Sequence, residues 1–139
     1  MRKAGLLLIA VMLAVAAWVY WQHGSRPAAK IIACADISQG CVMDDGTKLR
    51  FDHMPRVMQP FHLSASSDEA IEIHASFAMQ GMEMGLNRYR LLQQGNVWAV
   101  EVILPVCVRG RSDWLMLLEV QTRNGLERYQ LAFRTAQAN

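Results

Sequence analysis

Alternation of apolar and polar residues is the feature that most constrains the fold of this chain. Between Ala70 and Phe77 every second residue is apolar. The apolar positions are Ile71, Ile73, Ala75 and Phe77. Because successive side chains of a strand point to opposite faces, this pattern predicts a strand with one face buried. The same alternation recurs in residues 61–65, 97–104 and 128–134, which we also expect to be strands.

Turn signals separate these segments at short intervals. Asp44-Asp45-Gly46 comes before an expected strand at 48–51, and Asn124-Gly125 is typical of a type I′ hairpin turn. Further strands are expected in 86–92 and 114–120. About seven short strands over about 100 residues indicate an all-β fold, and this spacing is typical of an immunoglobulin-like β-sandwich.

The beginning of the chain follows a different pattern. Ala4 to Trp21 contains no charged residue, and Arg2 and Lys3 precede it. As a helix this run would be about 27 Å long, close to the roughly 30 Å hydrocarbon core of a bilayer. We therefore predict a single-pass transmembrane helix over residues 1–21. A cleaved signal peptide is the alternative, since small residues at 14–16 and 28–29 could serve as a cleavage region.

This anchor also predicts the location of the rest of the chain. Basic residues before the span orient the N-terminus toward the cytoplasm, so we expect the remainder outside the inner (cytoplasmic) membrane, in the periplasm or the extracellular space. Residues 22–33 read as a linker and 34–139 as the exported domain. Without Arg2 and Lys3, 14 − 2 = 12 basic residues balance 12 acidic ones. A neutral domain without a basic stripe predicts no nucleic-acid partner.

Three methionines lie between two of the expected strands. Met82 and Met84 are two positions apart and would share one side of a strand, and a turn or bulge at Gly81 could bring Met79 to them. Thioether sulfur is a soft ligand that favours Cu(I), so the three methionines form a candidate copper site, with His74 as a candidate fourth ligand. Packing at one end of the sandwich is the alternative, because methionine also fills irregular gaps in cores.

The three cysteines predict a disulfide in an oxidising compartment. We favour a bond between Cys34 and Cys41, which leaves Cys107 as a candidate free thiol. Pairing of either cysteine with Cys107 remains open, because spacing alone does not determine connectivity.

The methionine segment and the strands that follow resemble a known group of domains. The segments that carry the resemblance are Ser76–Met84, Val97–Val100 and Gly110–Leu115. Over about residues 61–121 the chain is similar to the YtkA-like and FixH-like domains, which are small exported or membrane-anchored β-sandwiches related in shape to CopC-type copper-resistance proteins. The resemblance implies that the three methionines match those of the family. It also implies an accessory role in copper handling or respiratory oxidase assembly.

Two departures from this family pattern concern its sulfur ligands. Pro105-Val106-Cys107 stands where such domains often carry a further methionine, and the pattern does not require Cys34 or Cys41.

No enzyme motif accompanies these features. The sequence has no nucleophile elbow, no His-Glu-x-x-His and no phosphate-binding glycine loop, so we expect no catalytic activity. The alternative function is a metal-free interaction module that docks onto a membrane complex. Arg109, Arg111 and Trp114 form its candidate partner loop.

Overall fold

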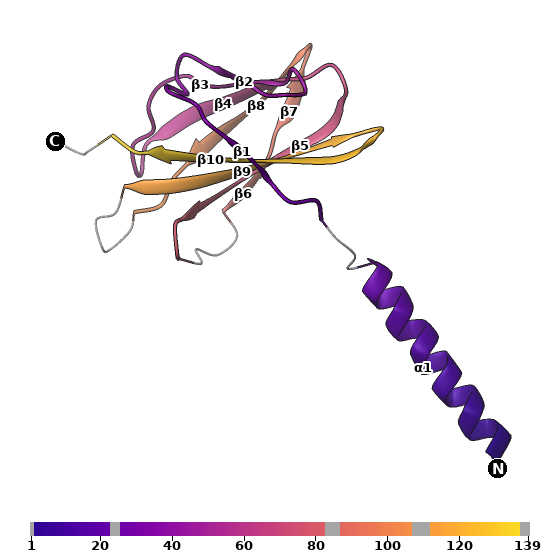
Figure 1. Ribbon diagram of the computed structural model, residues 1–139. Coiled ribbons are helices and arrows are strands. Elements are labelled where there is room, and N and C mark those ends of the chain that lie inside the picture. Colours follow the sequence, from indigo (N-terminus) through magenta and orange to yellow (C-terminus); the bar gives the residue numbers. More distant parts are fainter. Residues whose placement is uncertain (1, 23–25, 83–86, 107–111, 137–139) are drawn as a thin grey trace.

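The computed structural model describes residues 2–22, 26–82, 87–106 and 112–136. One helix, α1 (Arg2–Gln22), precedes a domain made of short strands (Figure 1). The strands of the described residues are β1 (Lys30–Ile32), β2 (Cys41–Val42), β3 (Lys48–Phe51), β4 (Pro60–Ser66), β5 (Ala70–Met79), β6 (Arg88–Arg90), β7 (Leu92–Gln94), β8 (Val97–Ile103), β9 (Asp113–Thr122) and β10 (Gly125–Arg134).

The strands form two five-stranded sheets that pack face to face. Sheet I has the order β1-β10-β9-β5-β6, and sheet II has the order β2-β3-β4-β8-β7. The prediction of an all-β sandwich is confirmed. The described residues contain ten strands rather than about seven, because β1 and β2 lie in segments without strand patterning and because the expected strand at 86–92 is divided in two.

Leu91 is the point at which the chain passes from sheet I to sheet II. It separates β6 from β7 and is fully buried, and its backbone N–H donates a 2.9 Å hydrogen bond to the carbonyl of Ile73. Apolar residues on both sides of this point resemble one continuous strand in the sequence. The side chain of Leu91 instead anchors a crossing between the two layers.

Aromatic side chains join the two sheets at the centre of the sandwich. The ring of Phe77 in β5 lies 6.1 Å from Phe61 in β4, 6.0 Å from Tyr89 in β6 and 6.2 Å from Phe133 in β10, measured between centroids. Phe51 in β3 completes the group, 4.9 Å from Phe61. The three contacts of Phe77 are edge-to-face, a geometry that adds to the free energy of apolar burial.

Ile71 departs from the alternation that predicted β5. The pairing of β5 with β9 shifts its register between Ala70 and Glu72, and 55% of Ile71 is exposed, whereas Ile73 is fully buried. An irregularity in the ladder changes the face to which a side chain points. The prediction that Ile71 shares the buried face of Ile73 was therefore wrong.

The sandwich begins within the segment that was expected to be a linker. β1 pairs in parallel with β10, with Lys30 opposite Tyr129. The ammonium of Lys30 lies 2.9 Å from a carboxylate oxygen of Glu127, and a guanidinium nitrogen of Arg128 donates a 3.0 Å hydrogen bond to the carbonyl of Pro27. The second half of the expected linker therefore belongs to the edge of sheet I.

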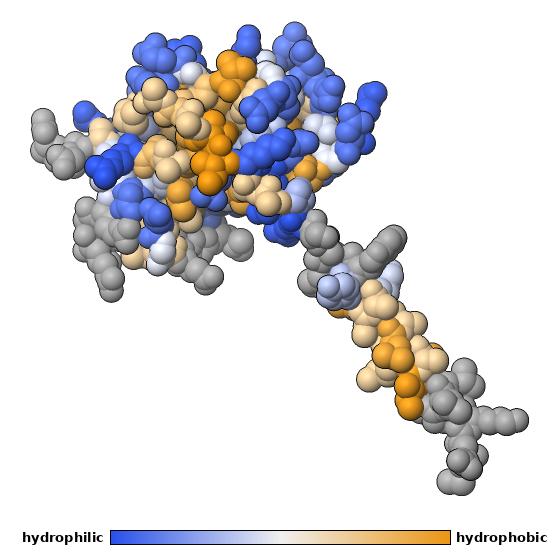
Figure 2. All heavy atoms as spheres, viewed as in Figure 1, coloured by the Kyte–Doolittle hydropathy of each residue, from blue (hydrophilic) through white to orange (hydrophobic). Residues whose placement is uncertain are grey.

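Helix α1 extends away from the sandwich (Figure 1). Its described side chains, at positions 9–20, are exposed, and Figure 2 shows that most of them are apolar. Among the described residues, no helix combines the length and the apolarity that crossing a membrane requires.

The predicted disulfide between Cys34 and Cys41 is present, with a Cα–Cα distance of 5.9 Å. It closes the loop between β1 and β2, where the side chain of Ile37 is buried in the core. The bond therefore ties β1, on the edge of sheet I, to β2, on the edge of sheet II. Cys107 lies outside the described residues.

This pairing predicts the thiol content of the chain. Alkylation of the unfolded, non-reduced protein is expected to modify one cysteine, Cys107, and alkylation after reduction should modify all three. Intact-mass measurement and peptide mapping distinguish these states. Modification of Cys34 or Cys41 without reductant would contradict the pairing.

Candidate functional site

The methionine segment begins at the end of β5 with a tight turn. Met79 is 1% exposed and lies opposite Trp114 of β9, and the N–H of Met82 donates a 3.1 Å hydrogen bond to the carbonyl of Met79. Gly81 has a φ of 74°, a value that glycine adopts without strain and that the third residue of a type II turn requires. The glycine thus makes the turn that was predicted between the two strands.

The structure does not bring His74 to Met79. The two residues are five positions apart in β5, which is about 17 Å along a strand, and they point to opposite faces of sheet I. The Nε2 atom of His74 lies 3.9 Å from a carboxylate oxygen of Glu72. Among the described residues, no three His, Cys, Asp or Glu side chains are arranged to hold a metal ion.

Only Met82 of the three methionines is both described and partly accessible. Its side chain is half-buried and packs against the core, and an isolated bridge pairs its backbone with that of Met79. Met84 lies outside the described residues. The copper site therefore stays a prediction, and burial of Met79 favours its role in packing.

The candidate partner loop is only partly described. Trp114 is 1% exposed and belongs to the core, so its side chain is not available to a partner. Arg109 and Arg111 lie outside the described residues. Alternation within β9 places Trp114 on the same buried face as Met116 and Leu118, a pattern that continues the apolar run of that strand.

A buried carboxylate on the outer face of sheet I was not predicted from the sequence. Glu119 of β9 is 7% exposed, and its two oxygens lie 3.1 Å from Arg88 and 3.2 Å from Arg128. Arg128 is its neighbour in β10, whereas Arg88 in β6 reaches it across β5. The two guanidinium groups compensate the charge of Glu119 and link three strands of the sheet. A single acidic residue within the apolar run of β9 was the only sequence signal.

A second ionic cluster lies at the start of β4. The carboxylate of Asp52 accepts hydrogen bonds from the backbone N–H groups of His53 and His62, both at 2.9 Å. The Nδ1 atoms of the same histidines lie 2.9 and 3.1 Å from its oxygens. Burial raises the pKa of Asp52, but these donors outweigh burial, so the pKa of Asp52 lies below its ordinary value of 3.8.

The depressed pKa of Asp52 predicts how its contribution to stability depends on pH. The contribution is complete above the unfolded-state pKa of about 4 and is lost as the pH falls through the lower folded-state pKa. Because 41% of the Asp52 side chain is exposed, we expect Asp52→Asn to lower the free energy of unfolding by only about 0.5–1 kcal/mol at pH 7. Urea denaturation at pH 7 and at pH 3 measures the difference, which should shrink at the lower pH. Asp68→Asn, which changes an exposed carboxylate, is the matched control, and an undiminished difference at pH 3 would contradict this account.

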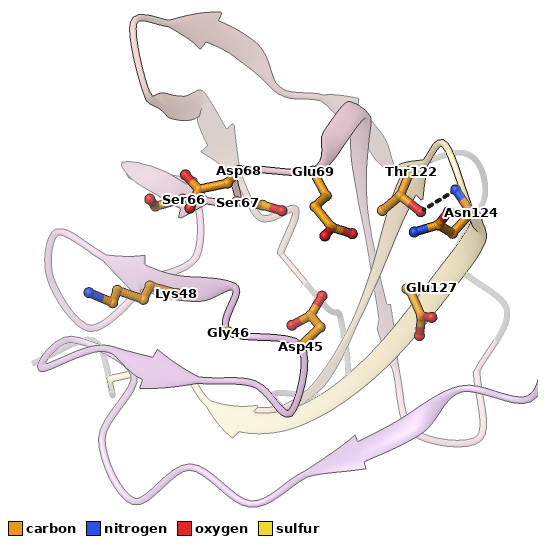
Figure 3. Close-up of a pocket in the computed structure, with 10 residues that line it drawn as sticks. All are labelled: Asp45, Gly46, Lys48, Ser66, Ser67, Asp68, Glu69, Thr122, Asn124 and Glu127. Carbon is orange, nitrogen blue, oxygen red and sulfur yellow. Dashed lines mark hydrogen bonds between the residues drawn. The ribbon is translucent and has the colours of Figure 1, made fainter.

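An acidic pocket of about 450 Å³ lies between the two sheets at the ends of several strands (Figure 3). Its four carboxylates come from three segments of the chain. They belong to Asp45, Asp68, Glu69 and Glu127. The hydroxyl of Thr122 accepts a 3.2 Å hydrogen bond from the N–H of Asn124 at its rim, as the dashed line in Figure 3 marks. The lining also holds the ammonium group of Lys48, so four carboxylates outnumber one cation, and this balance of charge disfavours anionic ligands.

The outer face of sheet II carries a trough of about 310 Å³ along β4, which we call the β4 trough. Ser64 and Ser66 of β4 line it, and their small side chains leave space between the larger residues of β3 and β8. The exposed residues that line it are Gln39, Gly40, Val42, Lys48, Arg50 and Val97. None of the described residues that line the trough is acidic. Sequence patterning predicted the strands, but not that serines of the central strand would form a depression between them.

Comparison with other proteins gives no relative from which a function could be inferred. No family, no curated protein and no solved structure gives a significant match to this chain.

Proposed function

We propose that this chain is an exported, membrane-anchored interaction module that docks its β-sandwich onto a membrane complex. The observation that carries the proposal is the contrast between Met79, buried in the core, and the apolar side chains exposed on the outer face of sheet II. These side chains are Val42, Leu92, Val97 and Ile103. A surface of this kind supports association with a protein more directly than it supports a metal site.

The anchor in this proposal is the uncharged run from Ala4 to Trp21. Its support is the sequence: the run continues on both sides of the described helical side chains at 9–20, and Arg2 and Lys3 favour an N-terminus in the cytoplasm. Pro27 already contacts Arg128, and five residue steps separate it from Gln22. A chain of that length spans at most about 18 Å, so the module would work close to the membrane surface.

The proposal includes an immunoglobulin-like topology for the sandwich. In such domains strands A, B, E and D form one sheet, and strands G, F and C form the other, which C′ extends in variable-type domains. The order β3-β4-β8-β7 fits A-B-E-D, and the order β10-β9-β5-β6 fits G-F-C-C′. Domains of this architecture serve many functions, so the topology is compatible with a binding module without specifying its partner.

Photocrosslinking in native membranes tests the docking function. A benzoylphenylalanine at Ile103 samples the outer face of sheet II, and one at Gln121 samples the outer face of sheet I. We expect one defined adduct from Ile103, and the chain should stay in the membrane fraction after a carbonate wash. Absence of an adduct from both positions, or release of the chain by carbonate, would reject the proposal.

Copper handling or respiratory oxidase assembly is the second candidate. The observation in its favour is that the turn at Gly81 places Met82 beside Met79 at one end of the sandwich, where Met82 is half-buried. Thioethers at such a site would bind Cu(I) without deprotonation.

Substitution of the methionines separates packing from copper binding. We expect Met79→Leu to leave the Cu(I) affinity unchanged and to alter the free energy of unfolding by less than about 1.5 kcal/mol, because leucine has a similar volume. Competitive Cu(I) titration of the full chain with a chromophoric chelator measures the affinity. If Met82→Leu and Met84→Leu also leave it unchanged, copper binding by these methionines is excluded.

A further inference from the structure

Ser64 and Ser66 form the floor of the β4 trough, and its two walls differ in chemistry. Ser64 pairs with Arg50 of β3 on one side and with Ala99 of β8 on the other, and Ser66 pairs with Lys48. The long cationic side chains therefore stand on the β3 side of the two serines. On the other side Val97 and Ala99 of β8 are apolar, and Glu101 follows Ala99 on the same face of β8 but does not line the trough.

Apolar residues extend this second wall toward the edge of the sheet. Val97 lines the trough, and Leu92 of β7 lies opposite Ala99 with 62% of its surface exposed. Val42 of β2, 68% exposed, closes the trough beyond Lys48. Covering these side chains removes apolar surface from water, which favours association.

The cations of the first wall are spaced as residues of a strand. Lys48 and Arg50 are two positions apart in β3, so their side chains emerge about 7 Å apart on the same face. The Nε atom of Arg50 donates a 3.1 Å hydrogen bond to the carbonyl of Ser38, which orients its guanidinium group. Carboxylates at alternate positions of an extended chain have the same spacing and the opposite charge.

We propose that the β4 trough docks an extended segment of a partner protein in which acidic residues alternate with apolar ones. The acidic side chains of this segment pair with Lys48 and Arg50, and its apolar side chains cover Val97 and Leu92. This inference rests on the proposed docking function and assigns a surface and a chemical class of partner to it.

Two synthetic peptides test the inference on the full chain in detergent micelles. The acidic peptide is acetyl-Ser-Glu-Val-Glu-Val-Ser-amide, and its matched control has lysine in place of both glutamates. In ¹⁵N-resolved NMR titrations we expect the acidic peptide to shift amide signals of β3, β4, β7 and β8, and to bind about tenfold more tightly than the lysine peptide at low salt.

Charge reversal in the trough provides the second measurement. Lys48→Glu combined with Arg50→Glu should abolish the preference for the acidic peptide. Arg56→Glu, which reverses an exposed charge outside the trough, should retain it. Signals of β5, β9 and β10 that stay in place show that each variant remains folded.

The results separate this inference from the proposed function. Equal binding of both peptides, shifts confined to the strands of sheet I, or no shift at millimolar acidic peptide would overturn the docking of an acidic segment. If Ile103 still gives a defined crosslinked partner in that case, the docking function stands and only the assigned partner chemistry is wrong. If crosslinking fails as well, both are rejected.

Discussion

Replacing Phe77 with alanine is expected to lower the free energy of unfolding by about 3–5 kcal/mol. Phe77 is 2% exposed, and its ring contacts aromatic rings from three other strands, in both sheets. Truncation removes apolar burial and leaves a cavity between the sheets that close-packed neighbours cannot fill without strain. Guanidinium denaturation followed by tryptophan fluorescence measures the loss, since Trp98 and Trp114 lie in the same core.

Two further substitutions make this measurement specific. Phe77→Leu retains most of the buried volume and should cost clearly less than Phe77→Ala. Ile71→Ala, on the same strand but at the exposed position beside the register shift, should change stability by less than about 0.5 kcal/mol. Equal effects of Phe77→Ala and Ile71→Ala would show that the core is not organised around Phe77.

Replacing Glu119 with glutamine is expected to lower the free energy of unfolding by about 2–4 kcal/mol. The substitution preserves the shape of the side chain but removes the charge that compensates Arg88 and Arg128. The side chain of Arg128 is only 19% exposed, so its guanidinium group would remain largely buried without a counter-charge. The same denaturation experiment measures the effect.

Glu101→Gln is the matched control for Glu119→Gln. The carboxylate of Glu101 is 59% exposed and lies 3.8 Å from His62, so we expect a change of less than about 0.5 kcal/mol. A loss of similar size at both positions would mean that Glu119 stabilises the sheet by no more than a surface ion pair does.

Local patterning predicted those strands whose two faces differ in polarity. The bounds of β3 match the expectation at Lys48–Phe51, and a hairpin turn lies between β9 and β10 as predicted. The predicted type I′ geometry at Asn124-Gly125 was wrong, because Gly125 pairs with Thr122 and Asn124 lacks the positive φ that such a turn requires. Patterning failed where pairing partners decide the structure. β1 is a strand because it pairs with β10. Ile71 is exposed because the pairing of β5 with β9 shifts its register beside this residue. A single sequence does not contain such non-local information in readable form.

For the candidate sites, too, local features could be predicted from the sequence and contacts between distant segments could not. The spacing correctly predicted a turn at Gly81. The side chain of Met79 is buried because Met79 pairs with Trp114 of β9, which is distant in the sequence. The ion cluster of Glu119 joins residues from β6, β9 and β10, and no local sequence motif predicts it. The short loop between Cys34 and Cys41 favoured their bond, but only the structure excludes a pairing of either cysteine with Cys107.

The parallel pairing of β1 with β10 has a mechanical consequence. A pull on α1 along the axis of β1 loads the three registered residues Lys30, Ile31 and Ile32 in shear, so their hydrogen bonds to β10 bear the force together. The contact of Lys30 with Glu127 and that of Arg128 with Pro27 share this load. Tension transmitted from the helix would therefore reach the sandwich through β10 before it could open the core.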